Sequence, residues 1–194
     1  MHDDELWQVF AENGQPIAGK GATDGAFDQD ASLLMGNAHV WLWRRGKSGI
    51  EVLLQRRSLT KKRRPGYYHI SAGGHINLGE LPIETAVRET KEELGIVIDP
   101  SLLYLAHIVR MPSRWRDFAH VYTYELRGDE TFSFDDGEVA SVEWRRLDDF
   151  DLMTRNPDAH TLVDSGGSYF EALIATLKRN EAHEDYRDNG PNQE

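Results

Sequence analysis

Alternating apolar and polar residues predict a core rich in β-strands. The alternation occurs in short runs that are separated by turn residues such as Gly, Pro and Asn. The first two runs, 6–10 and 17–20, flank a turn at 12–16 and predict an N-terminal β-hairpin within residues 5–20. Further strands are predicted over 37–44, 50–55, 67–72, 102–110, 119–126 and 139–146.

Two segments have the apolar spacing of helices. Between residues 82 and 94 apolar positions recur three and four apart, with Pro82 suited to the first helical position and Gly95 to the position after the last. A second amphipathic helix is predicted over 168–178. Strands with one helix between them and another near the end indicate an α/β or α+β sandwich.

The remaining segments predict little regular structure. Residues 21–35 are rich in Gly, Asp and Ala and predict a connector. Residues 180–194 are polar and predict a disordered tail. The length of 194 residues then predicts one domain over 1–179.

The composition excludes several classes of protein. The chain has no cysteine, which excludes disulfides, zinc–cysteine sites, Fe–S clusters and thiol catalysis. No apolar run approaches the length of a membrane-spanning helix, and the acidic start does not resemble a signal peptide, so we expect a cytoplasmic protein. The net charge of −11, concentrated at the two ends, argues against a nucleic-acid polymer as partner.

The chemistry is predicted on the helix at 82–94, where Glu89, Glu92 and Glu93 fall within one arc of the surface. Like charges this close destabilise a helix, and a divalent cation would offset the repulsion. Carboxylate oxygens are hard ligands, so Mg²⁺ or Mn²⁺ is the expected cofactor. Taken alone, the same pattern is also typical of a solvated acidic helix face.

The residues around these acids resemble the Nudix box, the signature of the Nudix hydrolase family. The signature is Gly, five residues, Glu, seven residues, Arg-Glu, a bulky apolar residue, any residue, Glu-Glu, any residue, Gly and a bulky apolar residue. The matching positions within 74–96 are Gly74, Glu80, Arg88, Glu89, Glu92, Glu93, Gly95 and Ile96. Thr90 departs from the bulky apolar position. We expect Thr90 to face the core, where it affects packing rather than chemistry.

The resemblance implies an α/β/α sandwich with a mixed central sheet. It also implies metal-dependent hydrolysis of a diphosphate bond in a nucleoside diphosphate linked to another moiety, X. Its site residues carry over by position, with Gly74 and Gly95 as structural support. Glu89, Glu92 and Glu93 match the metal-binding acids, and Glu89 is the candidate for activating water.

Four further positions near the box receive roles from the resemblance. Glu80 would support the site and pair with Arg88. Arg88 joins the catalytic set as a residue that orients the others, because it points to a different side of the helix from Glu89. The carbonyl of Gly73 is a candidate metal ligand. Glu138 is another, although a glutamate at the edge of a loop or strand is equally consistent with its sequence context.

The flanking segments resemble the subgroup related to isopentenyl-diphosphate isomerase. True isomerases carry a cysteine at the position of Gly73, and its absence favours an isomerase-like hydrolase over an isomerase. His39 and His75 match metal-binding histidines of the isomerases, but we expect them to be structural or substrate-facing. The segments that carry the resemblance are 5–14, 38–41, 53–58, 65–68 and 74–75.

The remaining alternative to an enzyme is a non-catalytic, nucleotide-binding regulatory domain.

Basic residues outside the box are candidates for binding the substrate, which we expect to be a small diphosphate compound. Arg56 and Arg57 fit phosphate capture, because guanidinium groups match phosphate oxygens. The basic run 61–64 reads more simply as an exposed loop. A second basic segment could form a lip over the substrate; its residues are Arg110, Arg114, Trp115 and Arg116. Trp115 or Tyr68 could stack on a base of the substrate. For both aromatic residues, packing within the protein or on its surface is the alternative.

Overall fold

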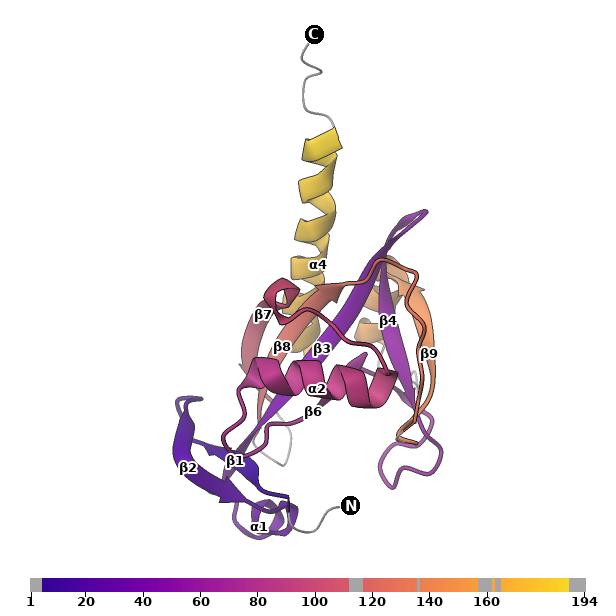
Figure 1. Ribbon diagram of the computed structural model, residues 1–194. Coiled ribbons are helices and arrows are strands. Elements are labelled where there is room, and N and C mark those ends of the chain that lie inside the picture. The colour runs from indigo at the N-terminus through magenta and orange to yellow at the C-terminus, as the bar shows by residue number, and fades with distance from the viewer. Residues whose placement is uncertain (1–4, 112–116, 136, 157–161, 163–164, 189–194) are drawn as a thin grey trace.

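The computed structural model describes residues 5–111, 117–135, 137–156, 162 and 165–188 (Figure 1). Within these residues, nine strands join in one sheet. The strands are β1 (Trp7–Phe10), β2 (Pro16–Ala22), β3 (Leu34–Gly46), β4 (Gly49–Arg57), β5 (Tyr68–His69), β6 (Ala72–His75), β7 (Tyr104–Arg110), β8 (Phe118–Glu125) and β9 (Val139–Arg146). The helices are α1 (Asp24–Gln29), α2 (Pro82–Leu94), α3 (Leu147–Arg155) and α4 (Gly167–Asp188), with a 3₁₀ turn at Pro100–Leu102.

The long strand β3 organises the sheet. It runs parallel to β8, with His39 opposite Val121, and antiparallel to β4, β6 and β1. β7 extends the sheet beyond β8, and β9 extends it beyond β4. The mixed central sheet expected from the sequence is therefore confirmed.

Helices cover both faces of this sheet, as Figure 1 shows. On one face, Ala86 and Leu94 of α2 pack with Val40 and Leu42 of β3. On the other face, α3 and α4 pack against Trp41 and the neighbouring strands. These two apolar clusters make the molecule an α/β/α sandwich, which confirms the expected fold.

The segment predicted as one strand over 67–72 forms two short strands. β5 pairs with β4 through His69 opposite Gln55, whereas β6 pairs with β3 through Gly73 opposite His39. The chain therefore crosses from one neighbour to the other before the box begins. This crossing places Gly73 and Gly74 against the centre of the sheet.

The N-terminal hairpin is present as β1 and β2, with Trp7 opposite Ala22. The segment 21–35, predicted as a connector, contains regular structure that the sequence did not indicate: α1 lies within it and β3 begins at Leu34. Phe27 of α1 is buried against Val9. That tertiary contact stabilises a helix too short to show a period in the sequence.

Two helical segments differ from the prediction near the C-terminus. α3 follows β9 directly and buries Leu147 and Phe150, one turn apart. α4 runs to Asp188, so the expectation of disorder is wrong for 180–188, while 189–194 lie outside the described residues. Neither Gly nor Pro interrupts the chain between 168 and 188, which allows the helix to continue. Its C-terminal half projects beyond the sheet (Figure 1).

Among the described residues, no helix combines the length and the apolar composition that a bilayer-spanning helix requires.

Candidate active site

The helix α2 is defined at both ends by local chemistry. Pro82 occupies its first turn, and the carboxylate of Glu84 accepts a 2.8 Å hydrogen bond from the backbone N–H of Leu81. Gly95 ends the helix in the left-handed conformation, with φ of 71°. Thr90 is fully buried and donates to the carbonyl of Ala86, so its predicted position in the core is confirmed.

Arg88 gathers the acids of the box around one guanidinium group. Nε and Nη2 donate to the two carboxylate oxygens of Glu80 at 2.9 and 3.0 Å. Nη1 donates to Glu89 at 2.6 Å and to Glu92 at 3.1 Å. The predicted pairing of Glu80 with Arg88 is present. The expectation that Arg88 points away from Glu89 is wrong, because the long side chain folds back along the helix.

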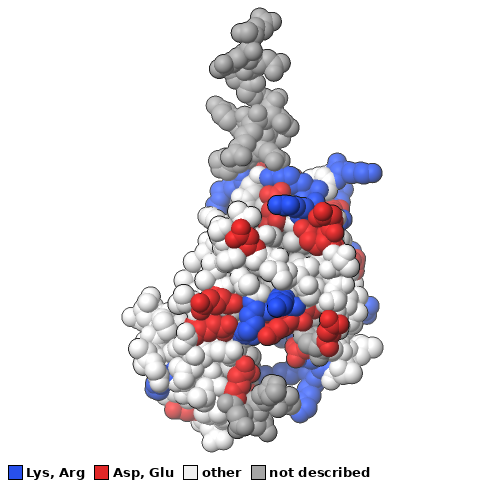
Figure 2. Space-filling model, in the orientation of Figure 1, with Lys and Arg blue, Asp and Glu red and all other residues white. Residues whose placement is uncertain are grey.

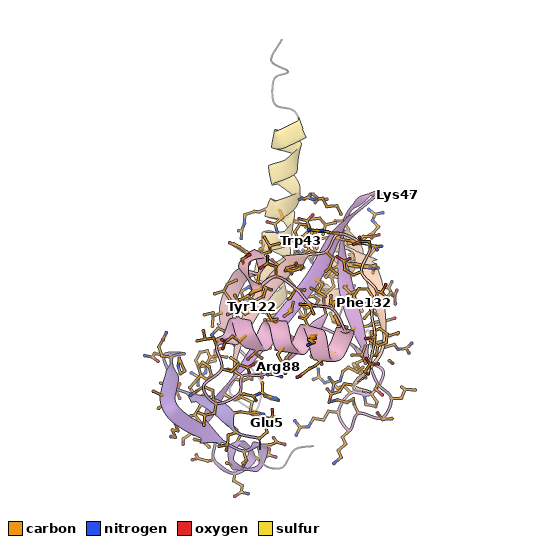
Figure 3. The ribbon with its side chains drawn as sticks, viewed as in Figure 1. Glu5, Trp43, Lys47, Arg88, Tyr122 and Phe132 are labelled. Carbon is orange, nitrogen blue, oxygen red and sulfur yellow. The ribbon has the colours of Figure 1, made fainter. Side chains whose placement is uncertain are left out.

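This network changes the proton affinity of its members. Burial raises the pKa of Glu80, but hydrogen bonds from Arg88, Thr85 and the backbone of Asn77 outweigh burial and lower it. Burial lowers the pKa of Arg88, yet its contacts with Glu80 and Glu89 raise the pKa above the ordinary value. Glu80 and Arg88 are thus a fixed ion pair at neutral pH. Figure 3 shows Arg88 on the side of α2 that faces the N-terminal hairpin.

Glu89 lies between Arg88 and the strand β6. A Cβ atom added to Gly74 would lie 2.1 Å from Oε1 of Glu89, so only glycine leaves room for this carboxylate. Burial raises the pKa of Glu89 to about 6, opposed by Arg88 and reinforced by the negative charges of Glu92 and Glu138. A positive charge placed here would relieve this repulsion.

Glu93 points into the protein, while Glu92 is exposed. The carboxylate of Glu93, in a residue only 7% exposed, accepts hydrogen bonds from the amide of Gln55 at 3.0 Å and from the backbone of Gly73 at 2.9 Å. The sequence indicated no role for Gln55. Its only signal was a polar residue at the end of an apolar strand, and that signal does not identify a partner 38 positions away.

The donor set fits a hard divalent cation. The oxygens are carboxylates, which Mg²⁺ and Mn²⁺ prefer, and the Arg88 cation already lies between Glu89 and Glu92. Figure 2 shows red and blue side chains side by side across the face that α2 covers. Among the described residues, however, no three His, Asp or Glu side chains stand in the arrangement of a complete metal site.

The two further candidate ligands lie near these acids. Gly73 is fixed by its N–H bond to Glu93 and by β-pairing, since a Cβ there would lie 2.5 Å from the carbonyl oxygen of Ala38. Glu138 forms a 2.6 Å ion pair with Lys61. Its negative charge nevertheless acts on Glu89 and on Arg57, which places it at the margin of the site.

The two candidate phosphate-binding arginines differ in position. Arg56 is exposed and donates to the carbonyl of Gly66. Arg57 is half-buried; burial lowers its pKa, and the charges of Glu138 and Glu93 raise it. Arg57 donates from Nε to the carbonyl of Arg63 at 3.3 Å, and it is the one of the two on which the charges of these acids act.

The two candidate histidines lie on neighbouring strands. His39 is held by the hydroxyl of Tyr169, 3.0 Å from its Nδ1. His75 stacks on Trp7, and its carbonyl accepts from Arg88 at 3.2 Å. Burial lowers the pKa of His39 to about 3 and that of His75 to about 4, so both rings are neutral.

The predicted lip is only partly described. Arg110 forms a 2.7 Å ion pair with Glu12 of the N-terminal hairpin. Arg114, Trp115 and Arg116 lie outside the described residues. The hydroxyl of Tyr68 donates to Glu143, which ties this ring to β9.

Comparison with known proteins identifies the family. The sequence model of the NUDIX domain matches residues 34–164. The chain belongs to the Nudix family. An uncharacterized Nudix hydrolase, orf19 of Rhodococcus erythropolis, is 33% identical over 168 residues, which are 84% of this chain and 88% of that protein. This Nudix chain is accordingly a pyrophosphohydrolase, as the resemblance implied.

The isomerase branch of the family matches over a shorter region. The isopentenyl-diphosphate Delta-isomerase of Streptomyces griseus is 48% identical over 59 residues, which are 30% of this Nudix chain and 29% of the isomerase. The likeness in this match is thus confined to less than a third of each protein, and this chain has glycine where true isomerases carry a cysteine, at Gly73.

Solved structures show the same fold. DR0079 from Deinococcus radiodurans has a TM-score of 0.63 and 21% identity, with 90% of this chain and 98% of that chain covered. The NUDIX domain of Shewanella oneidensis NrtR, complexed with ADP ribose, has a TM-score of 0.52 and 17% identity, with 68% and 88% covered.

Proposed function

We propose that this Nudix hydrolase uses Mg²⁺ or Mn²⁺ to hydrolyse the diphosphate bond of a nucleoside diphosphate linked to another moiety, X. The observation that carries the proposal is the gathering of Glu80, Glu89 and Glu92 on the guanidinium of Arg88, one turn from the buried Glu93. Acidic oxygens concentrated in this way suit a divalent cation that neutralises phosphate oxygens.

The metal would supply charge neutralisation and a water activated near neutral pH. Glu89, Glu92 and Glu93 are the residues proposed to hold it, together with the carbonyl of Gly73. Gln55 and Gly73 orient Glu93 through two hydrogen bonds. Arg88 orients Glu89 and Glu92, and we assign to Glu89 the proton of the attacking water.

The substrate side of the proposal rests on Arg57 and on the fold. Arg57 is half-buried and feels the charges of Glu138 and Glu93, and we assign to its guanidinium a contact with a phosphate oxygen. Arg56, which is exposed, would contact only a part of the substrate that extends outward. The NrtR domain of the same fold binds ADP ribose, a nucleoside diphosphate joined to a sugar, which supports this class of substrate.

The decisive experiment compares Glu93→Gln with a matched control. Hydrolysis of a panel of nucleoside diphosphate compounds, ADP ribose included, is measured with Mg²⁺, with Mn²⁺ and with EDTA. We expect Glu93→Gln to reduce turnover by about 100-fold or more while the protein stays folded. Glu84→Gln, on the same helix, keeps the oxygen that accepts from Leu81 and should retain full turnover.

Other outcomes would assign a different function. Tight nucleotide binding without release of phosphate would indicate a non-catalytic regulatory domain. Conversion of isopentenyl diphosphate to its isomer, with no phosphate released, would indicate the isomerase. Turnover that is unchanged in Glu93→Gln or in EDTA would contradict the proposed site.

A further inference from the structure

The N-terminal hairpin, which precedes the matched family domain, is attached to the box turn by backbone hydrogen bonds. The N–H of Gln8 donates to the carbonyl of Ile76 at 2.8 Å, and the N–H of Leu78 donates to the carbonyl of Leu6 at 2.8 Å. Trp7 lies opposite Asn77 in this antiparallel bridge. The turn between β6 and α2 is therefore an added partner of β1, although β1 is remote in sequence.

A buried side chain strengthens this attachment. Gln8 is 4% exposed, and its amide nitrogen donates to the carbonyl of Ile17 in β2 at 2.7 Å. Its amide oxygen accepts from the N–H of Gly79 at 3.3 Å. One side chain thus joins both strands of the hairpin to the turn that leads into Glu80.

Trp7 adds a stacked contact to a residue of the box itself. Its ring lies 3.7 Å from that of His75, centre to centre, with only 11° between the planes. On the hairpin side, Trp7 also stacks with Phe27 of α1 at 6.1 Å. The backbone of β1 and the ring of Phe27 fix the position of the indole, and the indole in turn packs on the ring of His75.

His75 connects this contact to the acids. Its carbonyl accepts from Nη2 of Arg88 at 3.2 Å, and the same guanidinium binds Glu80, Glu89 and Glu92. The preceding residue, Gly74, leaves no space for an added atom beside Glu89. A displacement of His75 would therefore be transmitted to Glu89 through two separate contacts.

We propose that Trp7 is a positioning residue of the active site. By stacking on His75, it fixes the turn 74–80 in the position that the contacts of this turn with Arg88 and Glu89 require. This inference rests on the proposed hydrolase activity. It assigns a function to the N-terminal hairpin, which precedes the residues that match the family model.

The test uses three variants of the full chain. Trp7→Ala removes the stack, and Trp7→Phe retains an aromatic ring in its place. Val9→Ala is the matched control, because Val9 is buried in the same hairpin cluster as Phe27 and pairs with Met35 of β3, but it is not one of the stacked rings. It weakens the packing of the hairpin without removing the stack.

Two measurements separate positioning from general stability. Turnover is measured on the best compound of the diphosphate panel, and the affinity for Mn²⁺ alone is measured by electron paramagnetic resonance. We expect Trp7→Ala to lower kcat and the Mn²⁺ affinity by roughly 10- to 100-fold each, with a smaller change in KM. Trp7→Phe should recover most of both, and Val9→Ala should match the wild type even where it lowers the melting temperature.

The inference is overturned if Trp7→Ala keeps both wild-type values, or if Val9→Ala loses as much as Trp7→Ala. Failure of the proposed function gives a different result: the wild type then hydrolyses no compound of the panel, and the Mn²⁺ affinities still compare the three variants. A wild type that binds no Mn²⁺ would also refute the role assigned to Trp7. The ring-current shift of the His75 protons, lost only in Trp7→Ala, reports the stack independently.

Discussion

Gly74 and Glu89 approach so closely that a single added methyl group would overlap the carboxylate. The added Cβ would lie 2.1 Å from Oε1 and 2.4 Å from Cδ of Glu89. These atoms are the far end of a flexible side chain, so the backbone could stay in place while the carboxylate moves. The glycine of the box is therefore explained by space for an acid rather than by backbone conformation.

We accordingly expect Gly74→Ala to fold but to lose activity. Displacing Glu89 by about 1 Å from its place beside Arg88 should reduce kcat by about 100-fold. Thermal unfolding and turnover of the variant are the measurements. Gly25→Ala serves as control, because an added Cβ at Gly25 meets nothing within 4 Å. Wild-type turnover in Gly74→Ala would show that the position of Glu89 is unimportant.

The ion pair between Arg88 and Glu80 predicts that loss of either residue lowers the free energy of unfolding. Arg88→Met leaves the carboxylate of Glu80, which is 16% exposed, with only Thr85 and Asn77 as donors. We expect a loss of about 2–3 kcal/mol in the free energy of unfolding, less than for a fully buried pair because both groups keep some solvent. Urea unfolding in EDTA measures it without a metal contribution.

A double-mutant cycle isolates that pair. Glu80→Gln combined with Arg88→Met should be more stable than the sum of the single changes predicts, by about 1–2 kcal/mol. The same cycle on Arg155 and Asp151, a pair whose arginine is 71% exposed, should give a clearly smaller coupling because solvent screens the charges. Both pairs are bidentate, so equal coupling in the two cycles would mean that the lower exposure of Arg88 adds nothing.

The hydrogen bond from Gln55 to Glu93 predicts an effect on metal binding. Gln55→Leu keeps a similar volume but removes the amide that orients the buried carboxylate. We expect the affinity for Mn²⁺, measured by isothermal titration, to fall about 10-fold. Thr176→Val also removes a buried polar group, but from α4 on the opposite face, and should bind Mn²⁺ as the wild type does. The prediction fails if the two variants have the same affinity.

The sequence predicted those parts of the fold and site that depend on local spacing. Glu89 and Glu92, three residues apart, do share the guanidinium of Arg88, whereas Glu93, expected on the same arc of the surface, points into the protein. Thr90 was placed in the core by the same periodicity. The strands were predicted from alternation; apart from 67–72, which divides into β5 and β6, they differ mainly at their ends, and β3 and β4 extend to meet at a two-residue turn.

The contacts that the sequence did not indicate join distant segments. Gln55 meets Glu93 across 38 positions, and Trp7 meets His75 only because the hairpin is folded against the box turn. The helix α1 was missed for the same reason, since burial of Phe27 stabilises it. Arg88 was assigned the wrong direction because a helical wheel fixes where a side chain begins but not where a long one ends.

The pair His39 and Tyr169 predicts a dependence of stability on pH. The hydroxyl of Tyr169 accepts from the indole of Trp41 at 2.8 Å and lies in hydrogen-bond contact with Nδ1 of His39 at 3.0 Å, where the tautomer of the imidazole sets which group donates. Burial, together with the neighbouring histidines His75, His107 and His120, lowers the pKa of His39 to about 3. The folded protein therefore keeps this ring neutral where the unfolded chain takes up a proton.

The sign follows from proton binding. Between pH 6.5 and 3 the unfolded state binds one more proton at His39 than the folded state, so the free energy of unfolding falls as the pH is lowered. His39→Gln can still accept from Tyr169 but does not titrate. From pH 7 to pH 5 we expect the variant to lose about 2 kcal/mol less than the wild type, measured by urea unfolding at each pH in EDTA.

Tyr169→Phe separates titration from the hydrogen bond. It removes the hydroxyl but leaves the edge-to-face contact between His39 and the same buried ring, so it should lower stability by a similar amount at every pH. Parallel pH profiles for the wild type and His39→Gln would show that His39 is protonated in the folded state as readily as in the unfolded chain. A profile of Tyr169→Phe as flat as that of His39→Gln would instead assign the pH dependence to the hydroxyl contact.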